Sequence, residues 1–240
     1  MPIKYNKDID YLAFRNIKEP LKEVYIFCSM GVDSVAATHF LINNYKNIIK
    51  NDGIIITVVH FNHGLRNQND KMQLRFEKFR NDLDLRGYTV LLECKNHTED
   101  ECRKRRLEYI GNSVYMKMCI TAHHMDDCAE SYLLNVFRGK EGFLPIPFVT
   151  EISRDSKFFD NCFLCHPFLF TEKRDFIEYA EKNDLMKYVV EDETNSVVKG
   201  SRRNLIRNEI IPILDRERMG LKTIVKKKMK QRLMLELMRA

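Results

Sequence analysis

The chain has 240 residues, of which 44% are apolar, and this is enough for the core of one large domain. The first eight residues lack the apolar segment of a signal peptide, and no apolar run is long enough to cross a membrane, so we expect a cytoplasmic protein without membrane contact. Seven cysteines without paired spacing argue against a disulfide framework, and the net charge of +6 gathers near the C-terminus.

A polar lead with a weak helix, residues 1–22, precedes the first strand at 24–27. Between this strand and a helix that continues to about residue 45 lies a polar loop: Ser29, Met30, Gly31, Val32, Asp33 and Ser34. Such a junction gathers backbone N–H groups around one point and suits a phosphate or pyrophosphate. Gly31 allows a positive φ or a close backbone approach, and Asp33 fits an anion site if a divalent cation lies between them. The alternative is an ordinary turn in which Ser or Asp caps the helix.

Strands and helices then alternate along the chain. Apolar runs predict strands at 54–60, 88–92 and 118–122, and helical spacing predicts helices at about 70–86 (ended by Gly87), at 99–111 and up to about 138. Four strand–helix units predict an α/β fold with a doubly wound, mostly parallel sheet. Ligands of such sheets bind beyond the carboxyl ends of the strands, where three polar loops are expected to converge: 29–34, 60–66 and 123–127.

Residues 143–185 change in character and predict an insertion. Two β-rich runs, 148–152 and 158–168, predict a hairpin outside the main sheet. Thr171 is the expected N-cap of a helix from 172 to about 182.

The C-terminal segment is strongly basic, because residues 199–240 carry +9 and the first 198 residues carry −3. Helices are expected from 202 and at 221–239. On the second helix, one cationic ridge is formed by successive i, i+4 neighbours: Lys222, Lys226 and Lys230. We therefore predict a nucleotide-binding and catalytic domain at 1–215 and a basic helical tail at 216–240 that binds a polyanion. The alternative is an ordinary solvated helix face.

An acidic block follows the fourth predicted strand: His123, His124, Asp126, Asp127 and Glu130. Adjacent histidines point in different directions and make a poor pair of zinc ligands, but the carboxylates could hold Mg²⁺ with phosphate oxygens or bind a cationic substrate. Asp126 and Glu130 share one helix face. The alternative is a helix start whose acidic residues complement the helix dipole.

These motifs, taken in order, resemble the tRNA(Ile)-lysidine synthetase family of PP-loop ATPases from about Val24 to Leu214. The blocks that carry the resemblance are Ser29–Ser34, Asn62–Arg66, Arg103-x-x-Arg106, Thr121–Glu130, Arg138-Gly139, Pro167–Leu169, Glu191–Asn195 and Arg203-Asn204-x-x-Arg207. The resemblance implies the PP-loop fold and ATP as cosubstrate. It implies adenylation of the wobble cytidine of a CAU-anticodon tRNA at its C2 oxygen, and then displacement of AMP by the ε-amine of L-lysine.

The resemblance and the residue types together suggest roles for individual side chains. Asp33 is the expected ligand of Mg²⁺, Arg103 and Arg106 are expected to neutralise charge, and His63 or His124 is the expected base. The lysine ammonium is expected at Asp127 and Glu130, with Asp126 second. The tRNA is expected at Arg202, Arg203, Arg207, Lys222, Lys226 and Lys230, because we expect the basic segment to substitute for the further domains with which bacterial members of the family hold tRNA. The oligomeric state, including a homodimer, stays open.

The chain also departs from the family pattern. Met30 replaces the family's first loop glycine, and a positive φ there would cost about 1–3 kcal/mol. One alternative function is another PP-loop tRNA-modifying enzyme such as a thiolase, for which the only support is Cys162-x-x-Cys165. A metal site there needs further ligands, so we interpret both cysteines as strand residues. The other alternative is a non-catalytic relative that binds nucleic acid.

Overall fold

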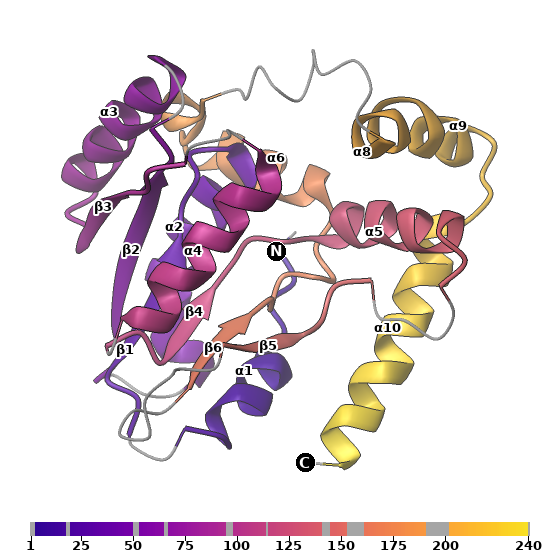
Figure 1. Cartoon of the computed structure of the whole chain (residues 1–240), viewed down its shortest axis with the longest axis horizontal. Coiled ribbons are helices and arrows are strands. Elements are labelled where there is room, and N and C mark those ends of the chain that lie inside the picture. Colours follow the sequence, from indigo (N-terminus) through magenta and orange to yellow (C-terminus); the bar gives the residue numbers. More distant parts are fainter. Residues whose placement is uncertain are drawn as a thin grey trace.

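The computed structural model describes residues 3–17, 20–49, 53–64, 67–94, 98–113, 115–140, 145–152, 161–190 and 202–239 (Figure 1). The strands are β1 Glu23–Phe27, β2 Ile55–Asn62, β3 Gly87–Leu91, β4 Met118–Ile120, β5 Val149–Ile152 and β6 Cys162–Cys165. The α-helices are α1 Lys7–Phe14, α2 Val32–Ile49, α3 Asn67–Asp82, α4 Glu99–Asn112, α5 Met125–Phe137, α6 Lys173–Lys182, α8 Arg202–Leu205, α9 Ile211–Arg216 and α10 Leu221–Met238. The described residues also form two short helices, η1 Met186–Tyr188 and the π-helix η2 Ile206–Ile210. Within these ranges no helix combines the length and the apolar character that crossing a membrane requires.

The six strands form one sheet in the order β3-β2-β1-β4-β6-β5. All neighbouring pairs are parallel except β5 with β6. The prediction of an α/β fold with a doubly wound, mostly parallel sheet is confirmed. Because the chain reverses its direction of winding at β1, the ends of β1 and β4 border the crevice in which such sheets bind their ligands.

Helices cover both faces of the sheet, with α4 in front of it and α2 behind it in Figure 1. Side chains of β1 alternate between these layers, because Val24 and Ile26 pack into the larger core cluster and Tyr25 packs into the smaller one. The larger cluster contains side chains of α2 and α6, and the smaller one contains Cys102 and Ile110 of α4. A continuous apolar run is therefore needed in each central strand.

The expectation of a hairpin outside the main sheet is wrong. β5 and β6 pair antiparallel with each other, but β6 also pairs parallel with β4, so that Phe163 stands beside Met118. Burial explains the difference, because Cys162, Phe163 and Cys165 are covered on both faces of the sheet. Both cysteines are strand residues, as we interpreted them. The segment 153–160 between the two strands lies outside the described residues.

Two expected helix boundaries are also wrong. Gly87 does not end α3 but begins β3. A Cβ atom at this position would lie 2.4 Å from the carbonyl oxygen of Val58, so only glycine lets the backbones of β3 and β2 come this close. Thr171 does not cap α6, whose N-cap is Glu172. Instead the Thr171 hydroxyl accepts a hydrogen bond from the Lys4 N–H at 2.9 Å and donates one to the Lys4 carbonyl at 3.0 Å. It thereby fixes the N-terminal segment over the core.

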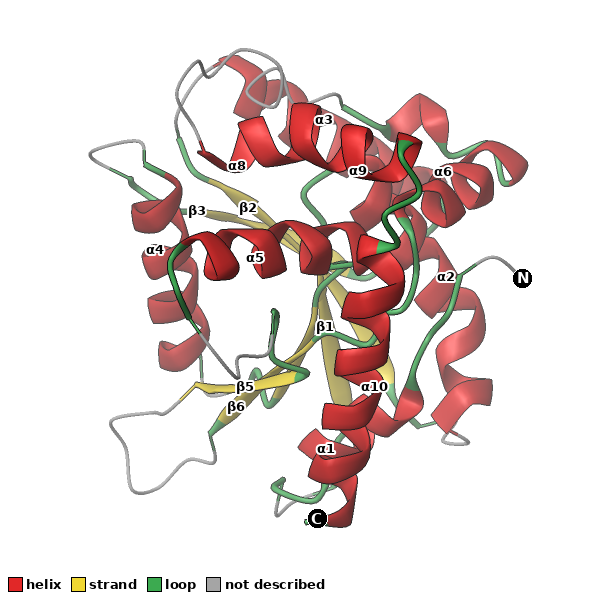
Figure 2. Cartoon of the chain, turned by 90° about the vertical axis from the view of Figure 1, so that its right-hand side faces the viewer, coloured by secondary structure: helices red, strands yellow, loops and turns green. Residues whose placement is uncertain are grey.

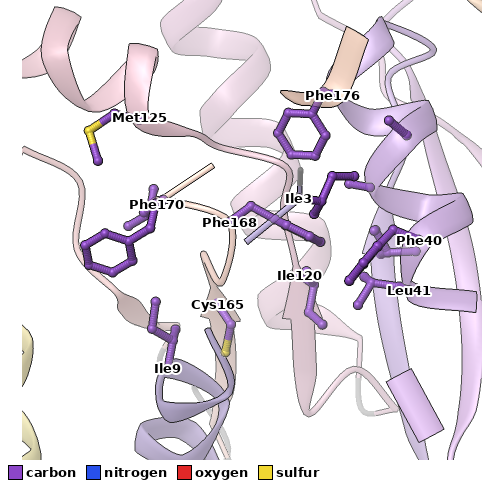
Figure 3. Close-up of a cluster of buried hydrophobic side chains, with 14 of the residues drawn as sticks. Ile3, Ile9, Phe40, Leu41, Ile120, Met125, Cys165, Phe168, Phe170 and Phe176 are labelled. Atoms are coloured by element: carbon purple, nitrogen blue, oxygen red, sulfur yellow. The ribbon is translucent and has the colours of Figure 1, made fainter. Parts of the chain in front are cut away.

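Aromatic rings fill the core between α2, α6 and the segment that follows β6 (Figure 3). The Phe168 ring meets Phe40 at 6.1 Å and Phe176 at 5.6 Å between centroids, in edge-on contacts. This packing holds the start of α6 beside the start of α2, and therefore next to the polar loop.

The basic C-terminal helix α10 packs against α5 and α1 (Figure 2). Its apolar side is buried in the larger core cluster and consists of Leu221, Val225, Met229 and Leu233. The spacing of four residues places all of them on one face of the helix. α10 therefore shares the core with the sheet and its flanking helices.

Candidate active site

The loop Ser29–Ser34 connects β1 to α2 and is braced from within by Ser34. The Ser34 hydroxyl donates to the Gly31 carbonyl at 2.9 Å and accepts from the Ser29 N–H at 3.1 Å. The Ser29 and Ser34 hydroxyl oxygens lie 3.2 Å apart. This bracing leaves the first N–H groups of α2, which have no partner within the helix, at the end of the sheet where an anion would bind.

The strained position of this loop is Met30 and not Gly31. Met30 has φ 69° and is fully buried, whereas Gly31 is outside the left-handed region. The sequence left a positive φ open at both positions, and the structure has it at Met30. The Met30 carbonyl accepts a hydrogen bond from the Val190 N–H at 2.9 Å, and this bond helps to hold the unfavourable conformation.

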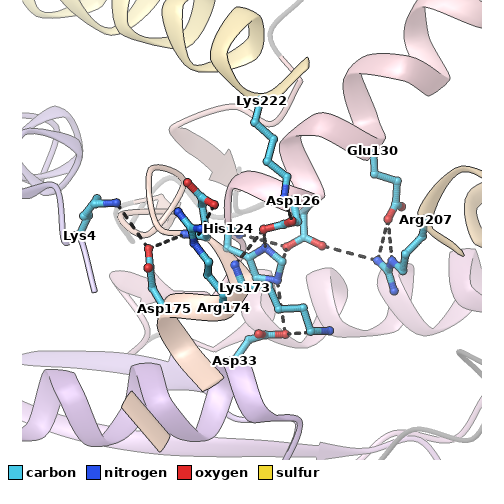
Figure 4. Close-up of polar contacts among 12 residues, drawn as sticks. Lys4, Asp33, His124, Asp126, Glu130, Lys173, Arg174, Asp175, Arg207 and Lys222 are labelled. Atoms are coloured by element: carbon cyan, nitrogen blue, oxygen red, sulfur yellow. Dashed lines mark hydrogen bonds and ion pairs between the residues drawn. The ribbon is translucent and has the colours of Figure 1, made fainter. Parts of the chain in front are cut away.

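Four side chains form the acidic cluster at the ends of β1 and β4: Asp33, His124, Asp126 and Asp127. Figure 4 shows Asp33 and Asp126 beside His124. His124 Nε2 lies 3.4 Å from Asp33 Oδ2 and 3.5 Å from Asp127 Oδ2, and His124 Nδ1 lies 3.7 Å from Asp126 Oδ2. Asp127 Oδ2 also accepts the His124 N–H at 3.0 Å and so fixes the start of α5. The loops after β1 and β4 thus meet, as the sequence predicted.

The charges in the acidic cluster shift one another's pKa values. Burial opposes the charge of His124, but Asp127 and Asp33 outweigh it and raise the pKa of that imidazole. Burial also disfavours ionised Asp127, but His124 outweighs it and lowers the pKa of the carboxyl. The cluster therefore combines ionised carboxylates with an imidazole that binds a proton more strongly than usual.

Two lysine ammonium groups of the chain point into the acidic cluster. Lys222 Nζ of α10 lies 2.7 Å from Asp126 Oδ1, and Lys173 Nζ of α6 lies 4.0 Å from Asp33 Oδ2. The Lys173 N–H also donates to Asp126 Oδ2 at 2.8 Å. Lys222 was expected on an outward-facing ridge, but the structure directs it inward to Asp126. Lys173 was missed, because nothing in its local sequence indicates a contact with residues 47 and 140 positions away.

Glu130 lies one turn further along α5, and its side chain is only 1% exposed. Arg203 Nε donates to its Oε1, and Arg207 Nε donates to its Oε2 at 2.8 Å. Arg207 also reaches Asp127 Oδ1 at 3.6 Å. Both carboxylate oxygens of Glu130 are thus engaged, so Asp126 and Asp127 are more open to a cationic substrate than Glu130.

The other predicted residues lie around this cluster or away from it. Arg106 of α4 is close enough for its charge to act on both His63 and His123. Arg103 and Arg202 are exposed, as is Lys230, and Lys226 is partly exposed. His63 faces two cysteines, with its Nδ1 at 3.8 Å from Cys94 Sγ. The segments Leu65-Arg66 and Glu191–Asn195 lie outside the described residues.

The sequence also gave no sign of a histidine pair at the ends of β4 and β6. His123 Nδ1 and His166 Nδ1 lie 3.2 Å apart, and the Thr121 hydroxyl lies 2.8 Å from His123 Nδ1 and 2.5 Å from His166 Nδ1. Burial and then the charge of His123 lower the pKa of His166 far below its usual value, so His166 is neutral.

The residues present fit a magnesium ion. Asp33 Oδ1 is buried and has no hydrogen-bond partner among the residues that the structure describes. A carboxylate oxygen in that state, at the end of a loop built for an anion, is a suitable ligand for a hard divalent cation. Asp33 is the residue that would hold such an ion between itself and phosphate oxygens.

The sequence was compared with protein families and with curated proteins, and the family match includes the loop and the acidic cluster. A family model described as the PP-loop domain matches residues 5–214. The chain is 28% identical over 201 residues to tRNA(Ile)-lysidine synthase of Staphylococcus aureus strain MW2, covering 80% of this chain and 44% of that protein. It is 28% identical over 217 residues to tRNA(Ile)-lysidine synthase of Lactobacillus gasseri, covering 87% of this chain and 47% of that protein. The chain therefore spans less than half the length of these curated relatives.

Among solved structures, the fold is similar to the U34-tRNA thiolase NcsA from Methanococcus maripaludis, which was solved with its 4Fe–4S cluster. The TM-score is 0.67 at 14% identity, and the match covers 95% of this chain and 77% of that chain. At this identity the likeness shows the fold alone. Because the family model covers most of the sequence, from the N-terminal helix to α9, the chain belongs to the PP-loop family.

Proposed function

We propose that the chain is an ATP-dependent tRNA-modifying ligase of the lysidine synthase type. It would adenylate the wobble cytidine of a CAU-anticodon tRNA(Ile), join lysine to C2 of that base, and release AMP and pyrophosphate. The observation that carries the proposal is the acidic cluster beside the loop Ser29–Ser34, which already holds the ammonium groups of Lys222 and Lys173. A site that binds the alkylammonium groups of its own chain has the charge and spacing to bind that of free lysine.

The adenylation step uses the loop and Asp33. The N–H groups at the start of α2 hold the phosphates of ATP, and the Ser34 hydroxyl keeps the loop in shape. A bound Mg²⁺ would neutralise charge on the phosphate oxygens. The C2 oxygen of cytidine attacks the α-phosphorus, the bond to the β-phosphate oxygen breaks, and pyrophosphate leaves with its electron pair. Asp33 is the residue that would hold this ion.

The transfer step uses the other members of the acidic cluster. Asp126 and Asp127 bind the lysine ammonium, and His124 accepts a proton from it, which gives the free amine. The amine attacks C2, the C2–O bond breaks, and AMP leaves. His124 is better suited to this role than His63, because its Nε2 lies within 3.5 Å of both Asp33 and Asp127. Lys222 occupies Asp126 and has to move aside when the substrate binds.

The test is incubation of the chain with ATP, labelled lysine and bulk tRNA, followed by nucleotide and nucleoside analysis. We expect AMP, pyrophosphate and labelled lysidine, and no turnover in Asp33→Asn. ADP as the main nucleotide product would refute the PP-loop chemistry. AMP formation that does not depend on lysine would leave ATP cleavage in place but refute lysine as the substrate. Sulfur transfer to the base would identify a thiolase instead.

A matched pair of variants tests the lysine site. Asp126 and Asp215 both contact Lys222 Nζ, at 2.7 and 3.4 Å, but only Asp126 belongs to the acidic cluster. Loss of a charge-assisted partner costs about 1.5–3 kcal/mol, so Asp126→Asn should raise KM for lysine roughly 10- to 150-fold and change KM for ATP little. Asp215→Asn should leave both constants unchanged. Equal losses for both substrates in Asp126→Asn would point to a metal ligand.

We also propose that tRNA phosphates contact the outward side of α10, where Lys226 and Lys230 stand one turn apart. The double variant Lys226→Gln/Lys230→Gln should weaken tRNA binding for all sequences and reduce the slope of log affinity against log salt by about one per lost contact. The control, Lys7→Gln/Lys71→Gln, removes the same charge from two exposed positions elsewhere. Equal slopes in the two double variants would show that tRNA is bound by another surface.

A further inference from the structure

Three metal-binding side chains meet on the α4 side of the sheet, apart from the acidic cluster. His63 follows β2, Cys94 follows β3, and Cys102 lies in the first turn of α4. His63 Nδ1 and the two Sγ atoms all lie within 4.8 Å of one another. Across the residues that the structure describes, no other group of three His, Cys, Asp or Glu side chains converges in this way.

The spacing of these atoms suits a tetrahedral ion. With Zn–N about 2.0 Å and Zn–S about 2.3 Å, ligand atoms of a tetrahedral zinc site are about 3.5–3.8 Å apart. His63 Nδ1 and Cys94 Sγ are already 3.8 Å apart. Both cysteines are buried and His63 is partly exposed, so protein surrounds the site and solvent reaches one side of it. Only small side-chain movements separate this arrangement from zinc coordination.

The pKa shifts of two of these side chains act on zinc binding in opposite directions. Burial, and then the charge of Arg106, lower the pKa of His63 to about 4, so the imidazole is neutral and one nitrogen is available as a ligand. Burial and the neighbouring Cys94 raise the pKa of Cys102 to about 11, which opposes its ionisation, so the thiolate forms only where a bound dication stabilises it. A dication would replace the thiol protons, which pass to solvent, and would balance the two thiolates.

We propose that His63, Cys94 and Cys102 bind one zinc ion, with a water molecule in the fourth position. Thiolate and imidazole ligands select zinc over magnesium, so this ion is distinct from the one expected at Asp33. The site would fasten the first turn of α4 to the ends of β2 and β3. Arg106 lies one helical turn after Cys102, so the zinc would also fix this arginine at the edge of the active site.

The test measures metal and not turnover. The full chain is stripped with a chelator, loaded with Zn²⁺ or Co²⁺ alone, and analysed for metal content and for the spectrum of tetrahedral thiolate-bound cobalt. We expect one zinc per chain. Because loss of an outer-sphere partner already weakens metal binding 10- to 100-fold, Cys94→Ser and Cys102→Ser should each raise the zinc dissociation constant at least about 100-fold.

Cys162→Ala is the matched control, since Cys162 Sγ also lies close to another thiol, 3.7 Å from Cys119 Sγ, in a buried part of the sheet. It should keep the full zinc content and the cobalt spectrum. Circular dichroism of each variant tests whether it is folded. A second measurement needs no variant: in the unmodified chain, bound zinc should protect the thiols of Cys94 and Cys102 from an alkylating reagent. The proposal is overturned if the folded, unmodified chain binds no more zinc than the Cys94→Ser variant. It is also overturned if zinc protects neither thiol, or if the site assembles iron and sulfide instead.

Discussion

The left-handed backbone at Met30 predicts an inverted order of stability for two substitutions. Met30 is fully buried at φ 69°, so removing its side chain in Met30→Ala or Met30→Gly should cost about 2–5 kcal/mol of unfolding free energy in either case. The two variants differ in the backbone. Alanine retains the left-handed strain of roughly 1–2 kcal/mol, which glycine does not have. Glycine in turn loses about 0.4–1 kcal/mol through the greater freedom of its unfolded chain.

Met30→Gly should therefore be more stable than Met30→Ala, by up to about 1.5 kcal/mol. The neighbouring Gly31 gives the opposite sign and serves as the control. Its φ is not left-handed, and a Cβ atom there would meet Ser29 Oγ at 3.6 Å, an ordinary contact. Gly31→Ala should then be neutral or stabilising by about 0.4–1 kcal/mol.

The assay is urea unfolding followed by circular dichroism, with free energies compared at equal m-values. If Met30→Ala equals or exceeds Met30→Gly in stability, residue 30 does not hold a strained conformation in solution, and the reasoning about this loop is refuted. ATP binding measured on the same variants separates effects on stability from effects on function.

Three further predictions concern the stability of the fold. Burial raises the pKa of Asp10 from 3.8 to about 7, so the folded chain retains a proton that the unfolded chain releases. The unfolding free energy should therefore fall as pH rises from about 4 to 7, by up to roughly 4 kcal/mol. Urea titrations at a series of pH values measure this fall, and Asp10→Asn should flatten it. Glu130→Gln should destabilise by about 1–3 kcal/mol in urea unfolding, because it takes the charge from the buried partner of two arginines, and an unchanged midpoint would show that those contacts do not form in solution. Gly87→Ala should cost about 1–3 kcal/mol in thermal unfolding, since its Cβ atom would lie 2.4 Å from the Val58 carbonyl oxygen, whereas a neutral result would show that β3 is free to shift.

Features set by local pattern were predicted well from the sequence. The strand predicted at 54–60 is observed at Ile55–Asn62, and the helix predicted up to about residue 45 is observed at Val32–Ile49. The order of these elements alone implied a parallel sheet with polar loops at one edge. The meeting of Asp33 with Asp126 and Asp127 followed from that topology, since the loops after two neighbouring parallel strands end side by side.

Features set by contacts between distant residues were not predictable. Nothing near Lys222 indicates that it reaches Asp126, because that contact depends on how α10 packs against α5. The pairing of β6 with β4 likewise depends on burial across the whole sheet. The sequence allowed a positive φ at Gly31 or at Met30 and could not decide between them, because the loop conformation also depends on the hydrogen bond from the distant Val190 N–H to the Met30 carbonyl.

The burial of α10 determines which experiments on the basic segment are informative. Val225 and Met229 are fully buried in the same core cluster as Val24 and Ile26 of β1, so we expect the helix and the sheet to unfold as one cooperative unit. Backbone amides on the buried side of α10 should then exchange with solvent only as slowly as global unfolding allows. Truncating this helix would expose a core and measure folding, whereas charge substitutions on its outer side measure binding.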